Sequence, residues 1–385
     1  MKSKALIALG IAAVIAVGAA VAVATMQQSP APRAEIGNRL FPQLAARADD
    51  IRTIQVRHKN GSFSIVRTDD GWVVPEQSNY PASIDEVRRV LVGLAELRAL
   101  EAKTRSPNLY PELQVEDVSA PDAKSVQLTL KDANGGDVLS VLVGKQRFGR
   151  GTSSAGDGVY IRRSDDAQAW LAQGRLTVNR DAVQWLDRKI VDVKRERVRT
   201  VSLRTTEKEV TVTRTDPSEN DFTLAGVPDD HKVKSSWEIN SIGGAFESLE
   251  LDAVKPVAEV KFPETPAAEA VTFDGLKLTA YLADQDGGTW VRFVAAFEPS
   301  SQPTEQADAA QAAEKKEEEV AANEAKDKAD KDDASKLKPA DEVRKEVETI
   351  NARVGNWAYK LPSYKIDTFR KKFNDLIEPK EKKAS

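Results

Sequence analysis

Residue types that could carry out acid–base or metal chemistry are scarce in this chain of 385 residues. It contains two histidines, His58 and His231, and no cysteine. An ordinary zinc site needs a cluster of histidines or cysteines, and nucleophilic catalysis needs a serine or cysteine beside a base. His58 adjoins a turn and His231 lies in a polar loop, so we expect both imidazoles to be solvated. The sequence therefore predicts no catalytic, cofactor-binding or metal-binding residues.

Paired carboxylates are the other possible source of chemistry. Asp69-Asp70 and Asp165-Asp166 fall at expected turns or helix caps, where aspartate bonds to its own backbone. A glycosidase pair would have to converge in a cleft, which this spacing does not indicate. Nucleophile-elbow, P-loop and dinucleotide motifs do not occur, and we interpret Gly149-Arg150-Gly151 as a flexible connection. We predict that the protein is not an enzyme.

Aromatic residues could instead bind a sugar or a partner. Most of them lie beside apolar strand or helix positions and are expected in the core: Trp72, Tyr80, Tyr160, Trp170 and Trp185. Trp237 follows Ser235-Ser236 and precedes Glu238, so we expect it to be more exposed.

The first 25 residues carry the clearest signal. Lys2 and Lys4 precede an uncharged, mostly apolar run that ends at Thr25, and about 20 such residues cross a bilayer as a helix. Positive charge before the run favours a cytoplasmic N-terminus. Residues 1–25 thus predict a single-pass inner-membrane anchor with the soluble body in the periplasm. Ala22-Val23-Ala24 would also suit a signal peptidase, so a cleaved signal peptide is the alternative.

The elements after the anchor follow an α+β pattern. Residues 26–49 contain three prolines and predict an extended tether. Turns at Asn60-Gly61 and Asp69-Asp70-Gly71 separate alternating apolar residues, which is typical of β-hairpins. Ser83 can cap a helix with apolar residues at helical spacing, and a second hairpin is expected over 126–143. Short helices are expected at 166–173 and 181–191, and an amphipathic helix over Ile366–Ile377.

The pattern then recurs. Thr53-Ile54-Gln55-Val56 matches Thr200-Val201-Ser202-Leu203, and Arg67-Thr68-Asp69 matches Arg214-Thr215-Asp216 at the same offset of 147. The 126–143 hairpin resembles 276–297, and Val159–Arg162 resembles Trp357–Lys360. We predict an N-terminal transmembrane helix followed by two tandem β-hairpin–helix–β-hairpin repeats with antiparallel sheets, at 50–195 and 196–378.

Within the second repeat, residues 300–345 form a low-complexity insert rich in Ala, Glu and Lys. It contains no aromatic residue, so we do not expect it to form a core element.

Several short motifs carry a resemblance to a known family. These are Asp70-Gly71-Trp72, Tyr80-Pro81-Ala82-Ser83, Val143-Gly144, Val159-Tyr160-Ile161-Arg162 and the ending Trp357–Pro362. Together they resemble the bacterial domain of unknown function family 4340 over most of 50–378. The resemblance implies a setting beside gliding-motility-type ABC transporters, with a permease and a large extracytoplasmic subunit as partners. It implies no catalytic residues.

These observations lead to one expected function and two alternatives. We expect a membrane-anchored, extracytoplasmic, non-catalytic accessory subunit of an ABC-type transport system, which contacts partners through the edges of its 126–143 and 276–297 hairpins. The alternatives are a stand-alone periplasmic module that binds a glycan or peptide, and an unrecognised hydrolase. The net charge of -4 provides no basic surplus, so no nucleic-acid partner is expected.

Overall fold

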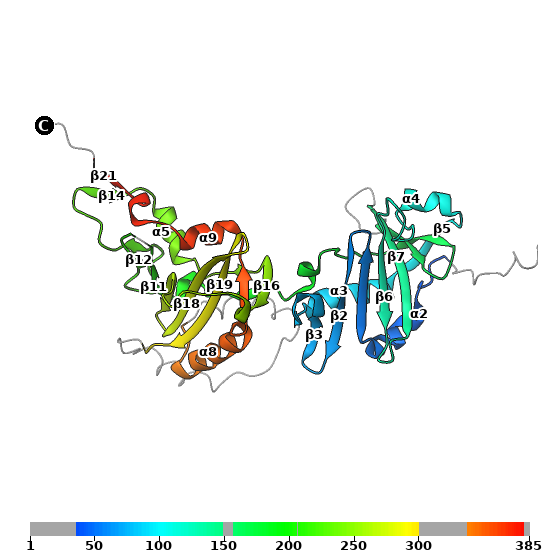
Figure 1. Cartoon of the computed structure of the whole chain (residues 1–385), viewed down its shortest axis with the longest axis horizontal. Helices are drawn as coiled ribbons and strands as arrows, with labels where there is room; N and C mark the ends of the chain where they lie inside the picture. The colour runs from blue at the N-terminus through cyan, green and yellow to red at the C-terminus, as the bar shows by residue number, and fades with distance from the viewer. Residues whose placement is uncertain (1–35, 149–156, 206, 300–336, 381–385) are drawn as a thin grey trace, which may run out of the picture. The chain divides into compact units, whose positions relative to one another are not determined.

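The computed structural model describes residues 36–148, 157–205, 207–299 and 337–380. The predicted anchor at 1–25 lies outside these residues. Within them, no helix is both long and apolar enough to cross a membrane. The chain divides into two compact units, one comprising Met1–Ser62 and Arg88–Arg180 and the other Phe63–Val87 and Asp181–Ser385. The protein is α+β, and its sheets are antiparallel (Figure 1).

A nine-stranded sheet has the order β4-β3-β2-β1-β6-β7-β8-β9-β5. The division between the units falls within it, because Phe63–Val87 contain β3 and β4. Its strands are β1 (Thr53–His58), β2 (Gly61–Thr68), β3 (Gly71–Val74), β4 (Tyr80–Pro81), β5 (Arg98–Thr104), β6 (Val126–Lys131), β7 (Asp137–Arg147), β8 (Gly158–Arg163) and β9 (Ala169–Gln173). The accompanying helices are α2 (Pro42–Ala46), α3 (Ile84–Glu96) and α4 (Tyr110–Leu113).

An eight-stranded sheet in the second unit has the order β13-β12-β11-β17-β18-β19-β20-β16. Its strands are β11 (Val198–Leu203), β12 (Val210–Thr213), β13 (Thr223–Leu224), β16 (Ala253–Pro256), β17 (Ala268–Thr272), β18 (Leu276–Gln285), β19 (Gly288–Phe297) and β20 (Trp357–Lys360). Two small sheets pair β10 (Lys189–Val191) with β15 (Leu249–Glu250), and β14 (His231–Val233) with β21 (Ile377–Pro379). The helices are α5 (Ser236–Gly243), α8 (Ala340–Val354) and α9 (Ser363–Phe369).

The two large sheets share one order of strands. Reading β3-β2-β1-β6-β7-β8-β9-β5 against β13-β12-β11-β17-β18-β19-β20-β16 pairs every strand with one of the same rank along the chain. In this order β8 corresponds to β19, so Tyr160-Ile161-Arg162 corresponds to Trp290-Val291-Arg292. The sequence matching had paired that segment with Trp357–Lys360, which lies one strand further on, in β20. The 126–143 hairpin likewise corresponds to β17–β18.

The predicted hairpins and the first helix are confirmed. Helix α3 begins after Ser83, whose Oγ accepts a hydrogen bond from the Glu86 amide at 3.2 Å. The two short helices were wrong. Residues 169–173 form strand β9, and 181–191 form a 3₁₀ turn (Ala182–Trp185) followed by β10. Ala169 and Leu171 are buried on one face of β9, so alternation outweighed helix propensity there.

The predicted tether is folded over its described part. Residues 36–49 include α2, and Phe41 and Leu44 are buried. The Gly37 amide donates to the Ala99 carbonyl at 2.8 Å, at the outer edge of β5. Two apolar side chains are enough to fix this segment against the first unit, despite its prolines.

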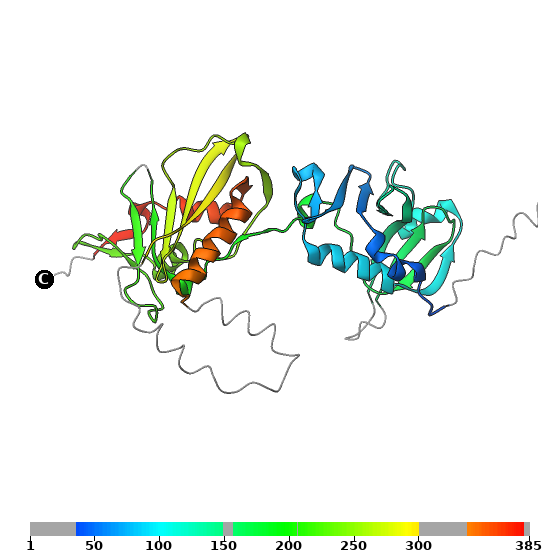
Figure 2. The same ribbon diagram turned by 90° about the horizontal axis from the view of Figure 1, so that it is seen from below.

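The predicted insert is shorter than 300–345. Residues 300–336 lie outside the described part, but 340–345 belong to α8, which runs along the second sheet (Figure 2). Val343 and Val354 are buried, and Val343, Val347, Ile350 and Val354 have helical spacing. Pro339 is the N-cap and has extended geometry (ψ 150°), so α8 begins sharply.

The C-terminal helix was only partly right. α9 ends at Phe369, and a 3₁₀ turn (Phe373–Asp375) and β21 follow. The five apolar residues of the predicted face are nevertheless all buried: Ile366, Phe369, Phe373, Leu376 and Ile377. Phe369 packs on Phe246, with ring centroids 5.2 Å apart, so this segment completes the core of the second unit.

Candidate functional site

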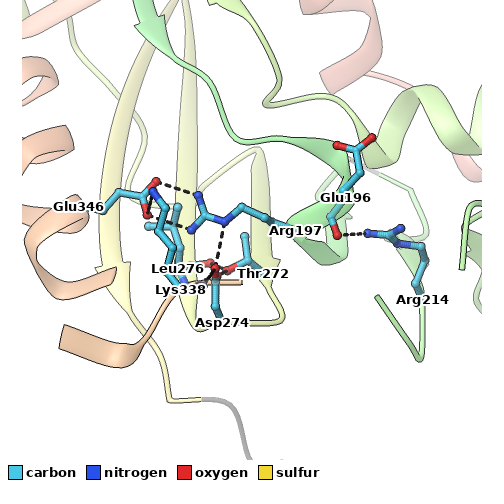
Figure 3. Close-up of polar contacts among 8 residues, drawn as sticks. All are labelled: Glu196, Arg197, Arg214, Thr272, Asp274, Leu276, Lys338 and Glu346. Atoms are coloured by element: carbon cyan, nitrogen blue, oxygen red, sulfur yellow. Dashed lines mark hydrogen bonds and ion pairs between the residues drawn. The ribbon is translucent and has the colours of Figure 1, made fainter. Parts of the chain in front are cut away.

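Four arginines with buried or half-buried guanidinium groups lie on or beside the two sheets, and they differ in their partners. The first, Arg197, precedes β11 and is 1% exposed. It forms two hydrogen bonds of 2.9 Å with the Glu346 carboxylate on α8 and one of 2.9 Å from Nε to Asp274, in the β17–β18 turn (Figure 3). Paired donors on a carboxylate are among the stronger polar contacts in proteins.

Further bonds fix the acids of this cluster. Thr272 Oγ1 donates to Asp274 and accepts from the Leu276 amide at 2.8 Å, and the Lys338 amide donates to Asp274 at 3.1 Å. Burial raises the pKa of Glu346, but the bond to Arg197 and the charges of Arg197 and Lys338 together outweigh it, and the pKa lies below its ordinary value. Burial likewise lowers the pKa of Arg197, but the bonds to Glu346 and the charge of Asp274 raise it overall. The cluster ties α8 to the sheet and leaves no group for chemistry.

Arg214 is buried without a carboxylate. Its guanidinium donates to the carbonyls of Arg195 (2.7 Å), Glu196 (2.9 Å) and Val198 (2.7 Å), and it stacks on Phe222 at 4.6 Å (Figure 3). Burial, and then the charge of Arg195, lower its pKa. Arg67 on β2, which sequence matching pairs with Arg214, is exposed. Arg214 therefore braces the turn that leads into β11.

Arg162 lies on β8, on the face that carries Leu142 and Ala169. It stacks on the Tyr110 ring at 4.5 Å and donates to the Val115 carbonyl (3.0 Å) and to Asp117 (2.9 Å). A further bond of 3.3 Å goes to the Asp166 carbonyl. The connection between β5 and β6 supplies most of these partners and covers an apolar cluster: Tyr110, Val115, Leu142 and Ala169. This arginine is enclosed by its own chain.

Arg292 occupies the corresponding strand position in the second sheet and is not enclosed. It lies opposite Tyr281 in the β18–β19 ladder, as Arg162 lies opposite Leu142. The guanidinium lies 4.3 Å from the Tyr281 ring centroid and 5.5 Å from that of Phe262. Its Nε is buried without a hydrogen-bond partner, and it has no ion pair in the described part of the chain.

Trp290, two residues earlier on the same face, extends this surface. Lys255 and Lys360 place their ammonium groups 4.2 and 5.0 Å from its ring centroid, and its Nε1 is buried without a partner. Lys255 is neutralised by Asp286 at 2.8 Å, and this bond lowers the pKa of Asp286. We call the face made by the half-buried Phe262, Tyr281, Arg292 and Lys360, together with the buried Trp290 beneath them, the outer aromatic surface. It is the candidate functional site, with aromatic rings and a cation that lacks an acid.

The residues considered for chemistry from the sequence do not converge. His58 accepts a bond from the Asn60 amide at 3.3 Å, and His231 bonds to its neighbour Asp230 at 2.7 Å and lowers the pKa of that acid. Asp165 pairs with Arg163, and its pKa is lowered by that bond. Gly149–Gly151 lie outside the described residues. No group of three His, Cys, Asp or Glu that could hold a metal occurs among the residues described.

The predicted burial of the aromatic residues is confirmed for some of them only. Tyr80 and Trp185 are buried, as expected, and burial raises the pKa of Tyr80 to about 12. Trp72, Tyr160 and Trp170 are only half-buried. Trp237 is 74% exposed, which confirms its predicted exposure. The sequence reasoning overlooked Trp290 and Arg292, although the pattern aromatic–aliphatic–arginine shared with Tyr160-Ile161-Arg162 could have identified them.

The predicted binding edges were wrong. β6 and β7 have partners on both sides, and so do β18 and β19, because both hairpins lie inside their sheets. β20 pairs with β19 only at Trp290 and Val291. Further along β19, Asn351 of α8 takes the place of a strand, since its side-chain amide accepts from the Ala295 amide (2.9 Å) and donates to the Ala295 carbonyl (2.8 Å).

Comparison with known proteins gives one family. The model of the domain of unknown function DUF4340 matches residues 72–274, from β3 in the first sheet to the β17–β18 turn in the second. Neither the curated proteins nor the solved structures gave a match. The single match covers more than half of the chain and parts of both sheets, so this chain belongs to the DUF4340 family of domains of unknown function.

Proposed function

We propose that this protein is a membrane-anchored, extracytoplasmic accessory subunit of an ABC-type transport system, which binds partner subunits and does not turn over a substrate. The observation that carries the proposal is Arg292, stacked between aromatic rings with no acid partner in the described chain. Arginine, tryptophan and tyrosine are the residues that most often dominate the binding energy of protein interfaces.

The other buried arginines support a binding role for this one by contrast. Arg162, Arg197 and Arg214 each have several fixed acceptors, so they stabilise the fold. A half-buried guanidinium that retains donors can form a strong bond with an incoming carboxylate, because a charged hydrogen bond beside apolar rings is stronger than one in bulk water. The outer aromatic surface thus suits a protein partner better than a reaction.

Anchoring would make such a contact effective. With residues 1–25 as a single-pass inner-membrane helix, the body is held in the periplasm beside membrane subunits. Tethering of this kind raises the effective concentration of a partner site to about the millimolar range. A surface of only a few aromatic and charged groups then suffices.

We further propose that the two sheets arose as tandem repeats of one unit. The identical order of eight strands supports this, together with the recurrence of an aromatic residue and an arginine in β8 and β19. The insert and α8 lie between β19 and β20, where the first repeat has only the short connection 164–168. Duplication would give the two sheets similar outer faces, with Arg162 covered by a connection in the first sheet and Arg292 left without an acid from the described chain in the second.

Photo-crosslinking in intact cells tests the proposal. A photoreactive residue at Val294, which is 39% exposed on β19 and two residues from Arg292, should capture an ABC permease or its companion extracytoplasmic subunit. The same residue at Val92 on α3, which is 46% exposed, is the matched control and should capture neither. A reporter active only outside the cytoplasm, fused after Ser385, checks the topology.

The same experiment decides the alternative. If Val294 captures no transport subunit and the purified chain binds a glycan or a peptide by itself, the protein is a stand-alone periplasmic binding module. A soluble mature chain that starts near Thr25 would replace the anchor with a cleaved signal peptide.

A further inference from the structure

The partners of Arg162 indicate what Arg292 lacks. Both arginines lie on corresponding strands, opposite Leu142 and Tyr281, and both stack on an aromatic ring at similar distances of 4.5 and 4.3 Å. Arg162 is completed by the Asp117 carboxylate and by two carbonyls from connections of its own chain. The first sheet therefore contains a filled version of the arrangement that stands open in the second.

The segment that covers each face explains the difference. In the first sheet the connection 105–125 supplies Tyr110, Val115 and Asp117. In the second the connection 257–267 is shorter, and it supplies Val260 and Phe262, which are apolar. Phe262 thus provides a ring for Arg292, but no acceptor comes with it in the described chain.

The charges around Arg292 favour an anion. Lys360 lies beside Trp290, while the neighbouring acids have their own cations, Asp286 with Lys255 (2.8 Å) and Asp284 with Arg370 (2.6 Å). Val294, further along the same face of β19, is exposed, so the face is open to solvent beside Arg292. An incoming carboxylate would meet a cation that is already oriented by two rings, which limits the entropy lost on binding.

We propose that Arg292 binds the carboxylate of an aspartate or glutamate side chain from a partner protein, in the place that Asp117 takes beside Arg162. This inference rests on the proposed function, which it deepens by naming the recognised group. A protein acid is favoured over an acidic sugar, because the filled site holds an aspartate side chain together with backbone carbonyls of the protein.

NMR titration of the full chain in detergent tests this. The protein carries ¹⁵N-labelled arginine and tryptophan, and the Arg292 Nε and Trp290 indole signals are assigned with Arg292→Lys and Trp290→Phe. The probe is an aspartate capped by an N-acetyl group and a C-terminal amide. Its asparagine counterpart is the isosteric neutral control, and glucuronate represents an acidic sugar. The aspartate probe should shift both signals, and the asparagine probe should not.

Arg292→Gln should weaken binding of the aspartate probe, followed on the Trp290 indole signal, about tenfold or more, as expected for loss of a charged hydrogen bond. Arg163→Gln, at an exposed arginine, should leave it unchanged. Equal shifts with the aspartate and asparagine probes, no shift with either, or shifts with glucuronate alone would overturn the inference. Capture from Val294 without carboxylate binding would leave the proposed function standing, whereas carboxylate binding without capture would remove the proposed function and keep the site.

Discussion

Arg162 and Arg292 occupy corresponding positions in two sheets of the same strand order, yet they have different surroundings. The longer connection over the first sheet delivers Asp117 and the Val115 carbonyl to Arg162, and the shorter one over the second delivers the Phe262 ring to Arg292. The same fold position therefore serves stability in one sheet and is free to bind in the other. The difference follows the length of the covering connection, which is 105–125 in the first sheet and the shorter 257–267 in the second.

The β17–β18 turn shows the opposite trend. Asp132, in the β6–β7 turn, bonds to the amides of Asn134 and Gly136 and pairs loosely with Arg47 at 3.6 Å. Asp274, in the β17–β18 turn, is buried against Arg197, because α8 brings Glu346 over it. Helix α8, between β19 and β20, thus covers one end of the second sheet, while the outer aromatic surface of that sheet is not covered by it.

The largest expected effect concerns the buried cluster of Arg197, Asp274 and Glu346. Arg197→Ala leaves Asp274 without a cation and Glu346 with Lys338 alone, at 3.2 Å, and removing one partner of a buried pair costs about 3–5 kcal/mol. We expect the free energy of unfolding, measured by denaturant titration, to fall by that amount. Arg344→Ala, at an exposed arginine on α8, the helix that carries Glu346, is the control and should cost under about 1 kcal/mol. Equal losses in the two variants would show that the cluster does not hold α8.

Arg162→Ala should be the next most damaging change. It removes a charged hydrogen bond to Asp117 and strips a donor from the Val115 carbonyl, which together cost about 2–3 kcal/mol. Thermal unfolding of the full chain checks this, with Arg163→Ala as the neighbouring exposed control. A loss of thermal stability as small as that of Arg163→Ala would mean that Arg162, like Arg292, contributes little to the stability of the fold.

The stability that the Arg197–Glu346 pair contributes should also depend on pH. The pKa of Glu346 is below its ordinary value of 4.5, so its contribution to stability is complete above that pH and is lost as the pH falls through the lowered pKa. Hydrogen exchange of the α8 amides, corrected for intrinsic rates, should therefore accelerate in acid below pH 4.5. Glu346→Gln should remove this acid step, and its persistence in that variant would assign it to another group.

Arg292→Gln should have the smallest effect on the fold. The arginine loses only its stacking on Tyr281 and Phe262, which is worth about 0.5–1 kcal/mol, and an unpaired half-buried charge is removed at the same time. Denaturant unfolding beside Arg162→Gln is the direct comparison. A loss as large as that of Arg162→Gln would mean that Arg292 is structural and would end the contrast between the two faces.

Local signals in the sequence predicted part of this structure. Asn60-Gly61 and Asp69-Asp70-Gly71 specify hairpins through backbone geometry, and Ser83 specifies a helix start, so these elements follow from neighbouring residues alone. The helix predicted at 166–173 was wrong, because pairing of β9 with β8 and β5 decides the conformation of this segment. Helix α8 was not predicted, because its start was assigned to the low-complexity insert, although its valines have helical spacing.

The candidate site was harder to predict. Trp290 and Arg292 look like ordinary alternating strand residues, and only the register with Tyr281 and the short covering connection show that the arginine lacks an acid. The hairpin edges were chosen because unpaired strand edges attract partner strands, but long-range pairing of β6 with β1 and of β18 with β17 places both hairpins inside their sheets. Neither fact is encoded within a short window of sequence.

The central claim is that the outer aromatic surface binds a partner through Arg292. The most direct measurement is the yield of crosslinked partner from a photoreactive residue at Val294 in intact cells, compared between the unaltered chain, Arg292→Gln and Arg163→Gln at equal protein levels. We predict capture of a transport subunit by the unaltered chain and by Arg163→Gln, with a fall of about tenfold for Arg292→Gln. Equal capture by all three chains, or no capture by any, would contradict the account.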